Sequence, residues 1–147
     1  MNSWYFEFQY DSRGFGSLIL REGNLISLMY DARSGSVDVD GDLVNAIKKG
    51  IWTIRDKPIP TEEIGMVVDS EKPAYKIRLH TPKGRWSHYL IHADGNKPGS
   101  RGCIVTAKQH GNTPVLYKDV SKILLTQEKI PVYINVDVPL EVKNGIV

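Results

Sequence analysis

The chain has a single cysteine among its 147 residues. An intrachain disulfide is therefore excluded, and the packing of apolar side chains must hold the fold together. With 41% hydrophobic residues at this length, the chain can bury an adequate core as one ordinary domain. We therefore expect residues 1–147 to form a single domain.

Long apolar runs and an excess of one charge are also lacking. No stretch has the length of a membrane span, and the N-terminal MNSWYFEFQY has neither the basic start nor the apolar run of a signal peptide. The 19 basic and 17 acidic residues are interspersed, without a basic block that could follow a phosphate backbone. We expect a chain made in the cytoplasm without a signal peptide, with no membrane span and no nucleic-acid partner.

Strand signals recur along the chain. Trp4, Phe6 and Phe8 alternate with polar residues, which is the period of a half-buried strand. The apolar runs 17–20 and 25–30 are separated by a Gly-Asn turn, which predicts a hairpin. Further short strands are predicted in 51–56, 75–79, 86–92 and 131–138.

Helix signals are few. Residues 42–50 and 117–126 are the best amphipathic candidates. Together, the strand and helix signals predict a mainly β fold, a β-rich α+β protein with one or two short helices.

The lone thiol lies in the segment HYLIHADGNKPGSRGCIVT, residues 88–106. Strand alternation places His88, Leu90 and His92 on one face, so His92 ends a strand where a loop rich in glycine begins. Cys103 follows that loop. A thiol becomes a useful nucleophile when a nearby base or cation raises its thiolate fraction, and a histidine at a neighbouring strand end is a common device. The amides of Gly102 and Cys103 could form an oxyanion hole.

Three other interpretations use the same kinds of residue. A lone cysteine beside Ile and Val is often a small core residue. Zinc could be held by a mixed ligand set, although the spacing matches no standard zinc pattern. The DVDGD run, residues 38–42, has a calcium-like composition without the glutamate of an EF-hand, and we interpret it as a solvated turn. The residues of the zinc alternative are His88, His92, Asp94 and Cys103.

The central segment resembles a known enzyme family. His92-Ala93-Asp94 followed by Ser100-Arg101-Gly102-Cys103-Ile104 is similar to the His…Ser-x-Gly-Cys-Ile signature of the L,D-transpeptidase (YkuD-like) peptidoglycan enzymes. Cys103 stands eleven positions after His92, a compact spacing closer to the type VI secretion effectors that share this fold. Residues 45–54 and the N-terminal hairpin resemble the family in less detail. The resemblance implies the family's β-sandwich or barrel catalytic domain.

The resemblance implies a covalent mechanism on peptidoglycan stem peptides. Cys103, deprotonated by His92, would attack the carbonyl that joins the L-centre of a diamino acid to terminal D-alanine. The thioester would pass to water, as in an L,D-carboxypeptidase, or to an amine, as in cross-linking or D-amino-acid exchange, and the sequence leaves these open. We expect no cofactor and no metal, a monomer, and action in the periplasm or cell wall after export or lysis. An immunity protein or a secretion apparatus is a further expected partner of an effector.

The resemblance also implies roles for the neighbouring residues. A backbone carbonyl at Ala93 or Asp94 would orient the imidazole, with the Asp94 carboxylate in support, and Gly102 would belong to the oxyanion hole. The family often carries an arginine where this chain has Val105, so the anchor of the substrate carboxylate is open among nearby basic residues. Aromatic residues could line the groove or simply pack. The expected substrate-binding residues are Ser100, Arg101, Tyr89 and Lys97, with Lys108 as another possible anchor and Trp86 as another groove residue.

Two rival functions remain open at this stage. A wall-binding module would keep the fold without the chemistry. A metal-dependent amidase would use His88, His92 and Cys103 as ligands.

Overall fold

The computed structural model describes residues 3–69, 73–95, 101–112 and 114–145. Its helices are α1 (Pro114–Ile123), α2 (Leu140–Lys143) and two 3-10 turns, η1 (Ile64–Met66) and η2 (Lys108–His110). Its strands are β1 (Trp4–Tyr10), β2 (Phe15–Glu22), β3 (Leu25–Arg33), β4 (Ser36–Val37), β5 (Leu43–Val44), β6 (Gly50–Ile54), β7 (Ile59–Thr61), β8 (Ala74–His80), β9 (Trp86–Ala93), β10 (Ile104–Thr106) and β11 (Ile130–Ile134).

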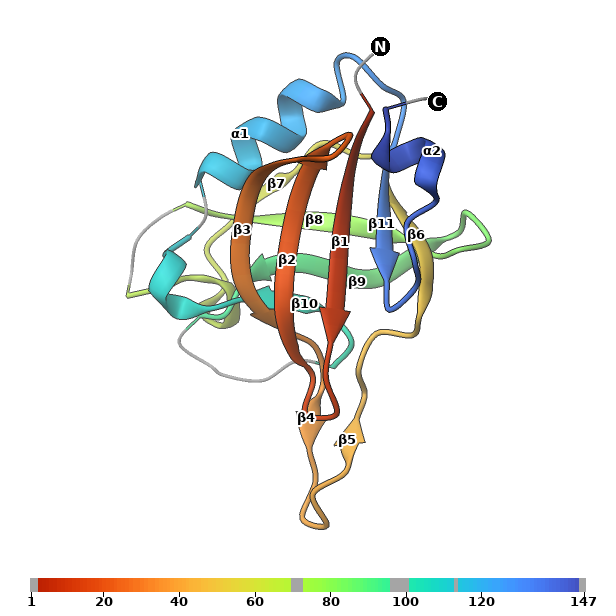
Figure 1. The fold of residues 1–147 in the computed structure, drawn as a ribbon. Coiled ribbons are helices and arrows are strands. Elements are labelled where there is room, and N and C mark those ends of the chain that lie inside the picture. Colours follow the sequence, from red (N-terminus) through yellow and green to blue (C-terminus); the bar gives the residue numbers. More distant parts are fainter. Residues whose placement is uncertain (1–2, 70–72, 96–100, 113, 146–147) are drawn as a thin grey trace.

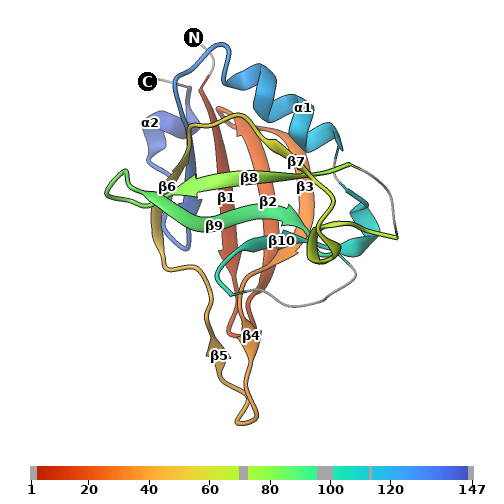
Figure 2. The ribbon, with the colours of Figure 1, turned by 180° about the vertical axis from the view of Figure 1, so that it is seen from behind.

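Nine of the described strands form one sheet that closes into a barrel, and β4 and β5 pair separately as a two-stranded ribbon. The sheet order is β6-β11-β1-β2-β3-β10-β9-β8-β7, and β6 also pairs with β8 where Thr53 lies opposite His80. Figures 1 and 2 show β1, β2 and β3 on one side of the barrel and β8, β9 and β10 crossing on the other. Of the described residues, only α1 and α2 form α-helices, which confirms the predicted mainly β, β-rich α+β fold.

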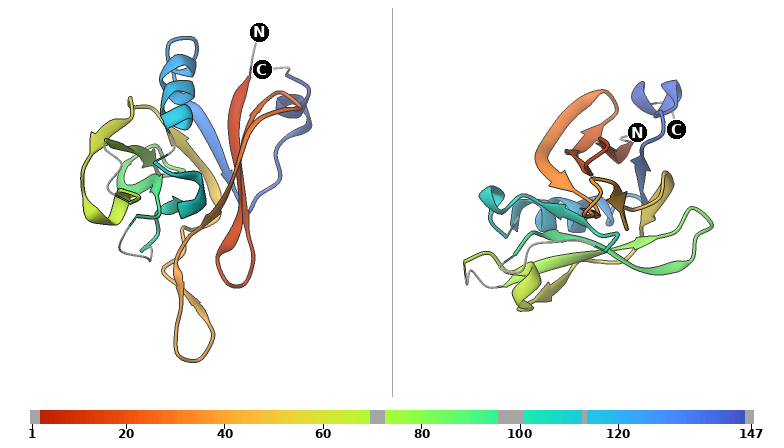
Figure 3. Two further views of the ribbon diagram at one scale, coloured as in Figure 1. Left: turned by 90° about the vertical axis from the view of Figure 1, so that its left-hand side faces the viewer. Right: turned by 90° about the horizontal axis from the view of Figure 1, so that it is seen from below.

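The barrel closes because alternate side chains of its strands are apolar. Phe6 and Phe8 of β1 point into the core and pair across the sheet with Leu20 and Leu18 of β2, and all four are essentially fully buried. Helix α1 lies across one end of the barrel, where Leu116, Val120 and Ile123 join the same core (Figure 3). In the part of the chain that the structure describes, no helix is long and apolar enough to cross a membrane.

The first and last strands are neighbours. β1 and β11 run parallel, with Phe6 beside Val132 and Phe8 beside Ile134. On the outer face of β1, Tyr5 packs with Tyr133 and Val138 in a smaller apolar cluster.

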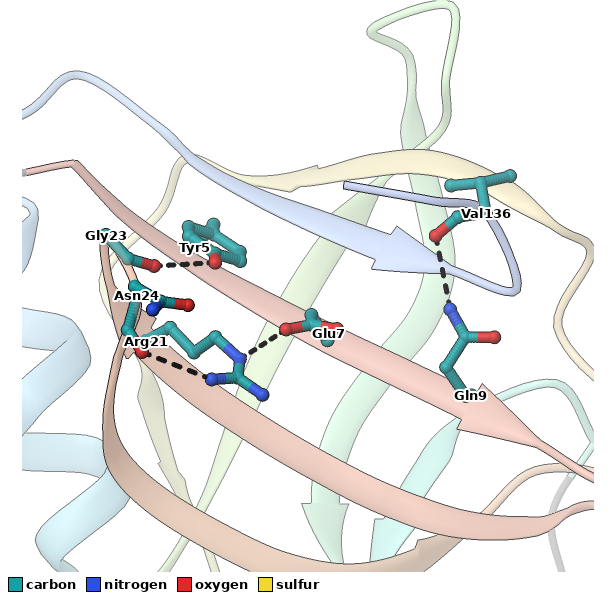
Figure 4. Close-up of polar contacts among 7 residues, drawn as sticks. All are labelled: Tyr5, Glu7, Gln9, Arg21, Gly23, Asn24 and Val136. Atoms are coloured by element: carbon teal, nitrogen blue, oxygen red, sulfur yellow. Dashed lines mark hydrogen bonds and ion pairs between the residues drawn. The ribbon is translucent and has the colours of Figure 1, made fainter. Parts of the chain in front are cut away.

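Polar contacts reinforce that outer face (Figure 4). The Tyr5 hydroxyl donates to the Gly23 carbonyl at 2.6 Å, and the Gln9 amide donates to the Val136 carbonyl at 3.1 Å. The Arg21 guanidinium pairs with the Glu7 carboxylate between them. These bonds attach β1 to the β2–β3 turn on one side and to the segment after β11 on the other.

The helix predicted for residues 42–50 is wrong. Asn45 has φ of 59°, and the segment runs from β5 into β6 without a helical turn. Ile47 is fully buried, with its N–H bonded to the Ser34 hydroxyl at 2.8 Å and its carbonyl bonded to the Tyr10 hydroxyl at 2.7 Å. Its apolar character thus reflects burial of a loop residue, which helical periodicity cannot distinguish from a helix face.

The second predicted helix and the predicted turn are confirmed. Residues 114–123 form α1, which begins three residues before the predicted start. In the 38–42 turn, the Asp38 carboxylate accepts the N–H groups of Asp40 and Asp42, each at 2.9 Å. All five residues of this turn are exposed.

Candidate active site

The register of β9 and β10 places His92 and Cys103 on one side of the sheet. The two strands are parallel, with Ile104 beside Ile91 and Val105 beside His92. Because Ile91 and Ile104 point into the core, His92 and Val105 point to the outer face. Cys103 comes one position before β10, and a hydrogen bond from the Leu90 backbone reaches its sulfur. The thiol therefore begins the same outer row, diagonal to His92.

The His92 imidazole is held in one tautomer. Its Nδ1 lies 2.7 Å from the Ala93 carbonyl, which can only accept, so Nδ1 carries the proton and Nε2 keeps its lone pair. The side chain is buried, and burial lowers the pKa of His92, although the Ala93 bond and Asp94 partly offset this effect. A neutral imidazole with its lone pair on Nε2 can accept a proton from a neighbouring group.

The Cys103 thiol is protonated at rest. Burial raises its pKa, while the Leu90 backbone bond and the Arg78 guanidinium lower the pKa by less. The sequence predicts that a neighbouring base or cation raises the thiolate fraction of Cys103. In the folded chain, burial outweighs these neighbours, and the thiolate fraction is lowered. The two groups therefore rest as a neutral thiol and a neutral imidazole, and the thiol would have to lose its proton before or during any reaction of the sulfur.

Basic residues from neighbouring strands flank this pair. In β8, Lys76 lies opposite His92 and Arg78 lies opposite Leu90, while Arg33 of β3 lies opposite Val105. Each therefore shares the outer face with His92. Sequence reasoning missed all three, because alternation within 75–79 gives the parity of Lys76 and Arg78 but not which strand lies beside them.

Arg78 of β8 and Trp86 at the start of β9 pack against each other on the strands next to Cys103. The Arg78 guanidinium lies 4.3 Å from the centre of the Trp86 ring and donates to the Ser87 carbonyl at 2.9 Å. Trp86 is exposed and meets the His88 ring edge to face. Trp86 is thus available to line a groove, as the resemblance implies.

Asp94 pairs with Arg33 through its carboxylate, which makes no hydrogen bond to the His92 ring among the described contacts. Its Oδ2 lies 3.0 Å from Arg33 Nη2, and its N–H donates to the Thr106 carbonyl at 2.8 Å. The Ala93 carbonyl already occupies His92 Nδ1, so Asp94 acts on the imidazole through its charge alone. Arg33 also lies directly opposite Val105, the position where the resembling family often has its arginine.

Gly102 precedes Cys103 in a backbone conformation that side chains disfavour. Its φ is 107°, and a Cβ there would lie 2.6 Å from a ring carbon of Tyr89. Tyr89 itself packs against the core, with its ring 5.6 Å from that of Trp52. Tyr89 therefore supports the Gly102 turn from the core side of β9.

Of the remaining predicted residues, only some have described positions. Ser100 and Lys97 lie outside the described residues, and Arg101 is exposed at the end of the loop. Among the residues with described positions, no three His, Cys, Asp or Glu side chains gather as metal ligands, so the zinc set is not assembled. His88 sits at the exposed end of β9 beside Trp86.

The geometry defines a barrel protein with a thiol and a buried imidazole on the outer face of two parallel strands. Comparison of the chain with models of protein families, with curated proteins and with solved structures gives no match.

Gly102→Ala should destabilise the fold more than Gly41→Ala. Both glycines have positive φ, but a Cβ at Gly41 meets no atom within 4 Å. We expect Gly41→Ala to lower the free energy of unfolding by about 1–2 kcal/mol, from backbone strain alone. Gly102→Ala adds a collision with Tyr89, for a loss of about 2–4 kcal/mol. Denaturant unfolding measures both values, and equal losses would contradict the close contact.

Arg78→Met should make the thiol less acidic. The guanidinium lowers the pKa of Cys103, so its removal leaves burial less opposed and moves the pKa further upward. The rate of iodoacetamide alkylation against pH measures this, with a wild-type midpoint above that of an ordinary cysteine. Arg55→Met, at an exposed position after β6, is the matched control. A downward shift in Arg78→Met would contradict the assignment.

Proposed function

We propose that the protein is a cysteine L,D-transpeptidase or L,D-carboxypeptidase of peptidoglycan. It would act on the bond between the L-centre of a diamino acid and the terminal D-alanine of a tetrapeptide stem. The observation that carries this proposal is the β9–β10 register together with the Leu90 backbone bond to the thiol. Continued by one residue, this register puts Cys103 opposite Leu90 and diagonal to His92 on one outer face. The Ala93 hydrogen bond supports it further, because it leaves His92 Nε2 able to accept the thiol proton.

The reaction begins from the neutral pair. His92 Nε2 takes the proton as the Cys103 sulfur attacks the carbonyl carbon, and the carbonyl electrons become an oxyanion. The amides of Gly102 and Cys103 are the proposed donors to that oxygen. When the C–N bond breaks, the imidazolium returns its proton to the departing D-alanine amine, and a thioester remains.

The second half-reaction decides the product. Water attacking the thioester, with His92 again as base, releases a tripeptide stem. The amine of another stem or of a D-amino acid gives a cross-linked or exchanged product instead. In each case the thiol regains its proton from His92, so the protons balance over one turnover.

The charge around the pair suits this substrate. A stem peptide carries carboxylates close to the scissile bond, and three basic side chains share the face of His92. They are Arg78, Lys76, which also pairs with Glu63, and Arg33, which also pairs with Asp94. Positive side chains around a partly buried site attract and orient carboxylates. Charge complementarity thus supports peptidoglycan stems as the substrate class.

The proposed substrate sets where the protein would work. Peptidoglycan lies outside the cytoplasmic membrane, so the chain would act in the periplasm or cell wall after export or lysis. If it is an injected effector, an immunity protein would be expected to cover the outer face that carries Cys103 and His92.

Mass spectrometry of stem peptides after incubation with the protein tests the proposal. We expect tetrapeptide stems to lose terminal D-alanine, as tripeptide, exchanged or cross-linked products, and pentapeptide stems to react poorly. Activity that disappears with chelator would favour the metal-dependent amidase. Stems that bind but stay unchanged would favour the wall-binding module.

A further inference from the structure

A pocket adjoins the candidate active site on its β3 side. It measures about 470 Å³ and lies between β3, β10 and η2. Val105, the residue directly beside His92, forms part of its wall. A substrate held at the thiol would therefore reach this pocket by extending along β10, from Cys103 past Val105.

The polar lining of the pocket carries equal numbers of both charges. Arg33 and Lys108 are basic, Asp31 and Asp94 are acidic, and Gln109 adds an amide. Gln109 donates to Asp31 at 2.7 Å. A pocket lined in this way is matched best by a ligand that is neutral overall and carries both charges itself.

The Arg33–Asp94 pair sits within this lining and is incompletely bonded. Its contact is one-point, from Arg33 Nη2 to Asp94 Oδ2 at 3.0 Å. Arg33 Nε and Asp94 Oδ1 are shielded from water and make no hydrogen bond within the described part of the chain. A buried donor and a buried acceptor left without partners are unfavourable, and a carboxylate can engage a guanidinium through two parallel bonds.

We propose that this pocket binds an amino acid zwitterion, an ammonium and a carboxylate on one carbon. The ligand carboxylate accepts hydrogen bonds from the Nε edge of Arg33, and the ligand ammonium donates to the Asp94 carboxylate. For this, the Arg33 and Asp94 side chains turn away from each other and toward the ligand. The ligand thereby supplies the acceptor and the donor that the pair lacks.

The proposal also deepens the proposed function, on which this step rests. Within a stem peptide, the acylated L-centre would sit at Cys103, and its side chain would extend past Val105 into the pocket. Only a diamino dicarboxylic acid ends its side chain in a second amino acid centre. The enzyme would therefore prefer stems with that residue over stems with lysine, whose side chain ends in an amine alone.

Three probes of matched chain length test the pocket without any turnover. They are meso-diaminopimelic acid with zwitterionic ends, pimelic acid with carboxylates only, and 1,5-diaminopentane with ammonium groups only. By calorimetry on the Cys103→Ala protein, we expect the first to bind at least about tenfold more tightly than the other two. Arg33→Met and Asp94→Asn, each added to Cys103→Ala, should each weaken its binding by about ten- to a hundredfold. Equal binding of all three probes, no binding at millimolar concentration, or binding that survives both substitutions would overturn the proposal.

Stem peptides then test the link to catalysis. We expect Arg33→Met to lower the ratio of kcat/KM for diaminopimelate stems over lysine stems by about tenfold or more, through KM. Arg33→Lys keeps the charge opposite Asp94 but loses the two-point contact, so it should fold and still lose most of the preference. Arg55→Met, with its melting temperature measured beside the others, is the control for removing an arginine.

The two proposals fail in distinguishable ways. If the wild type turns over neither stem, the proposed function fails, while probe binding still decides the pocket. If stems are turned over with a ratio that Arg33→Met leaves unchanged, the assignment of the pocket to the stem fails and the proposed function stands.

Discussion

Cys103→Ala is expected to abolish D-alanine release from tetrapeptide stems while the protein keeps its fold. Removal of the nucleophile leaves no path to the thioester, and loss of a catalytic nucleophile lowers kcat by about four orders of magnitude or more. The thiol is half-buried at the start of a strand, so its loss leaves a much smaller cavity than truncation of a large core side chain. Mass spectrometry of the stems, together with a thermal melt, measures both parts.

The matched variant for this experiment is Cys103→Ser. It keeps the size and the hydrogen-bonding capacity of the side chain, so it separates the nucleophile from packing if the alanine variant unfolds. Folded Cys103→Ala protein that still forms tripeptide, exchanged or cross-linked stems would place the nucleophile elsewhere.

His92→Ala is expected to be nearly as inactive, and the double variant with Cys103→Ala little worse than either single one. The resting thiol is protonated, so without Nε2 as acceptor the sulfur cannot attack efficiently. Because the two groups act as one unit, their effects on kcat should not multiply. His92→Gln fills more of the buried site and serves as the control for packing.

The pH profile of the wild type checks the same assignment. Burial disfavours the charged imidazolium and lowers the pKa of His92, so the neutral base persists at lower pH than for an exposed histidine. The acid limb of kcat/KM should therefore fall below about pH 6.5, the ordinary value for histidine. A midpoint of the acid limb above that value would contradict the assignment of His92 as the base. A double variant of His92→Ala and Cys103→Ala whose loss of kcat equals the product of the two single losses would contradict their action as one unit.

Local patterns predicted most of the barrel. β1 and the β2–β3 hairpin follow from period-two alternation and a Gly-Asn turn, both of which act over a few residues. The structure of the 42–50 segment could not be predicted from such local patterns. Its Ile47 side chain is buried in the barrel core, and its backbone bonds to Ser34 and Tyr10, which are distant in the sequence.

The candidate site was predictable in part for the same reason. His92 and Cys103 lie within one loop of each other, so a single segment revealed both. Arg33 and Arg78 reach the site from other strands, and their position depends on strand order, which alternation does not encode. The opposing effects of burial on the thiol and the imidazole likewise depend on neighbours that only the folded chain provides.

The parallel pairing of β1 with β11 constrains the order in which the barrel is completed. During synthesis at about 5–20 residues per second, β1 emerges roughly 6–26 s before β11, and β2 can satisfy only one of its edges in that interval. The other edge of β1 stays open until the strand containing Val132 and Ile134 is available. Contacts between residues so distant in sequence make barrel closure a slow, late event. In a newly made chain, β1 is therefore the strand whose edge stays unpaired for the longest time.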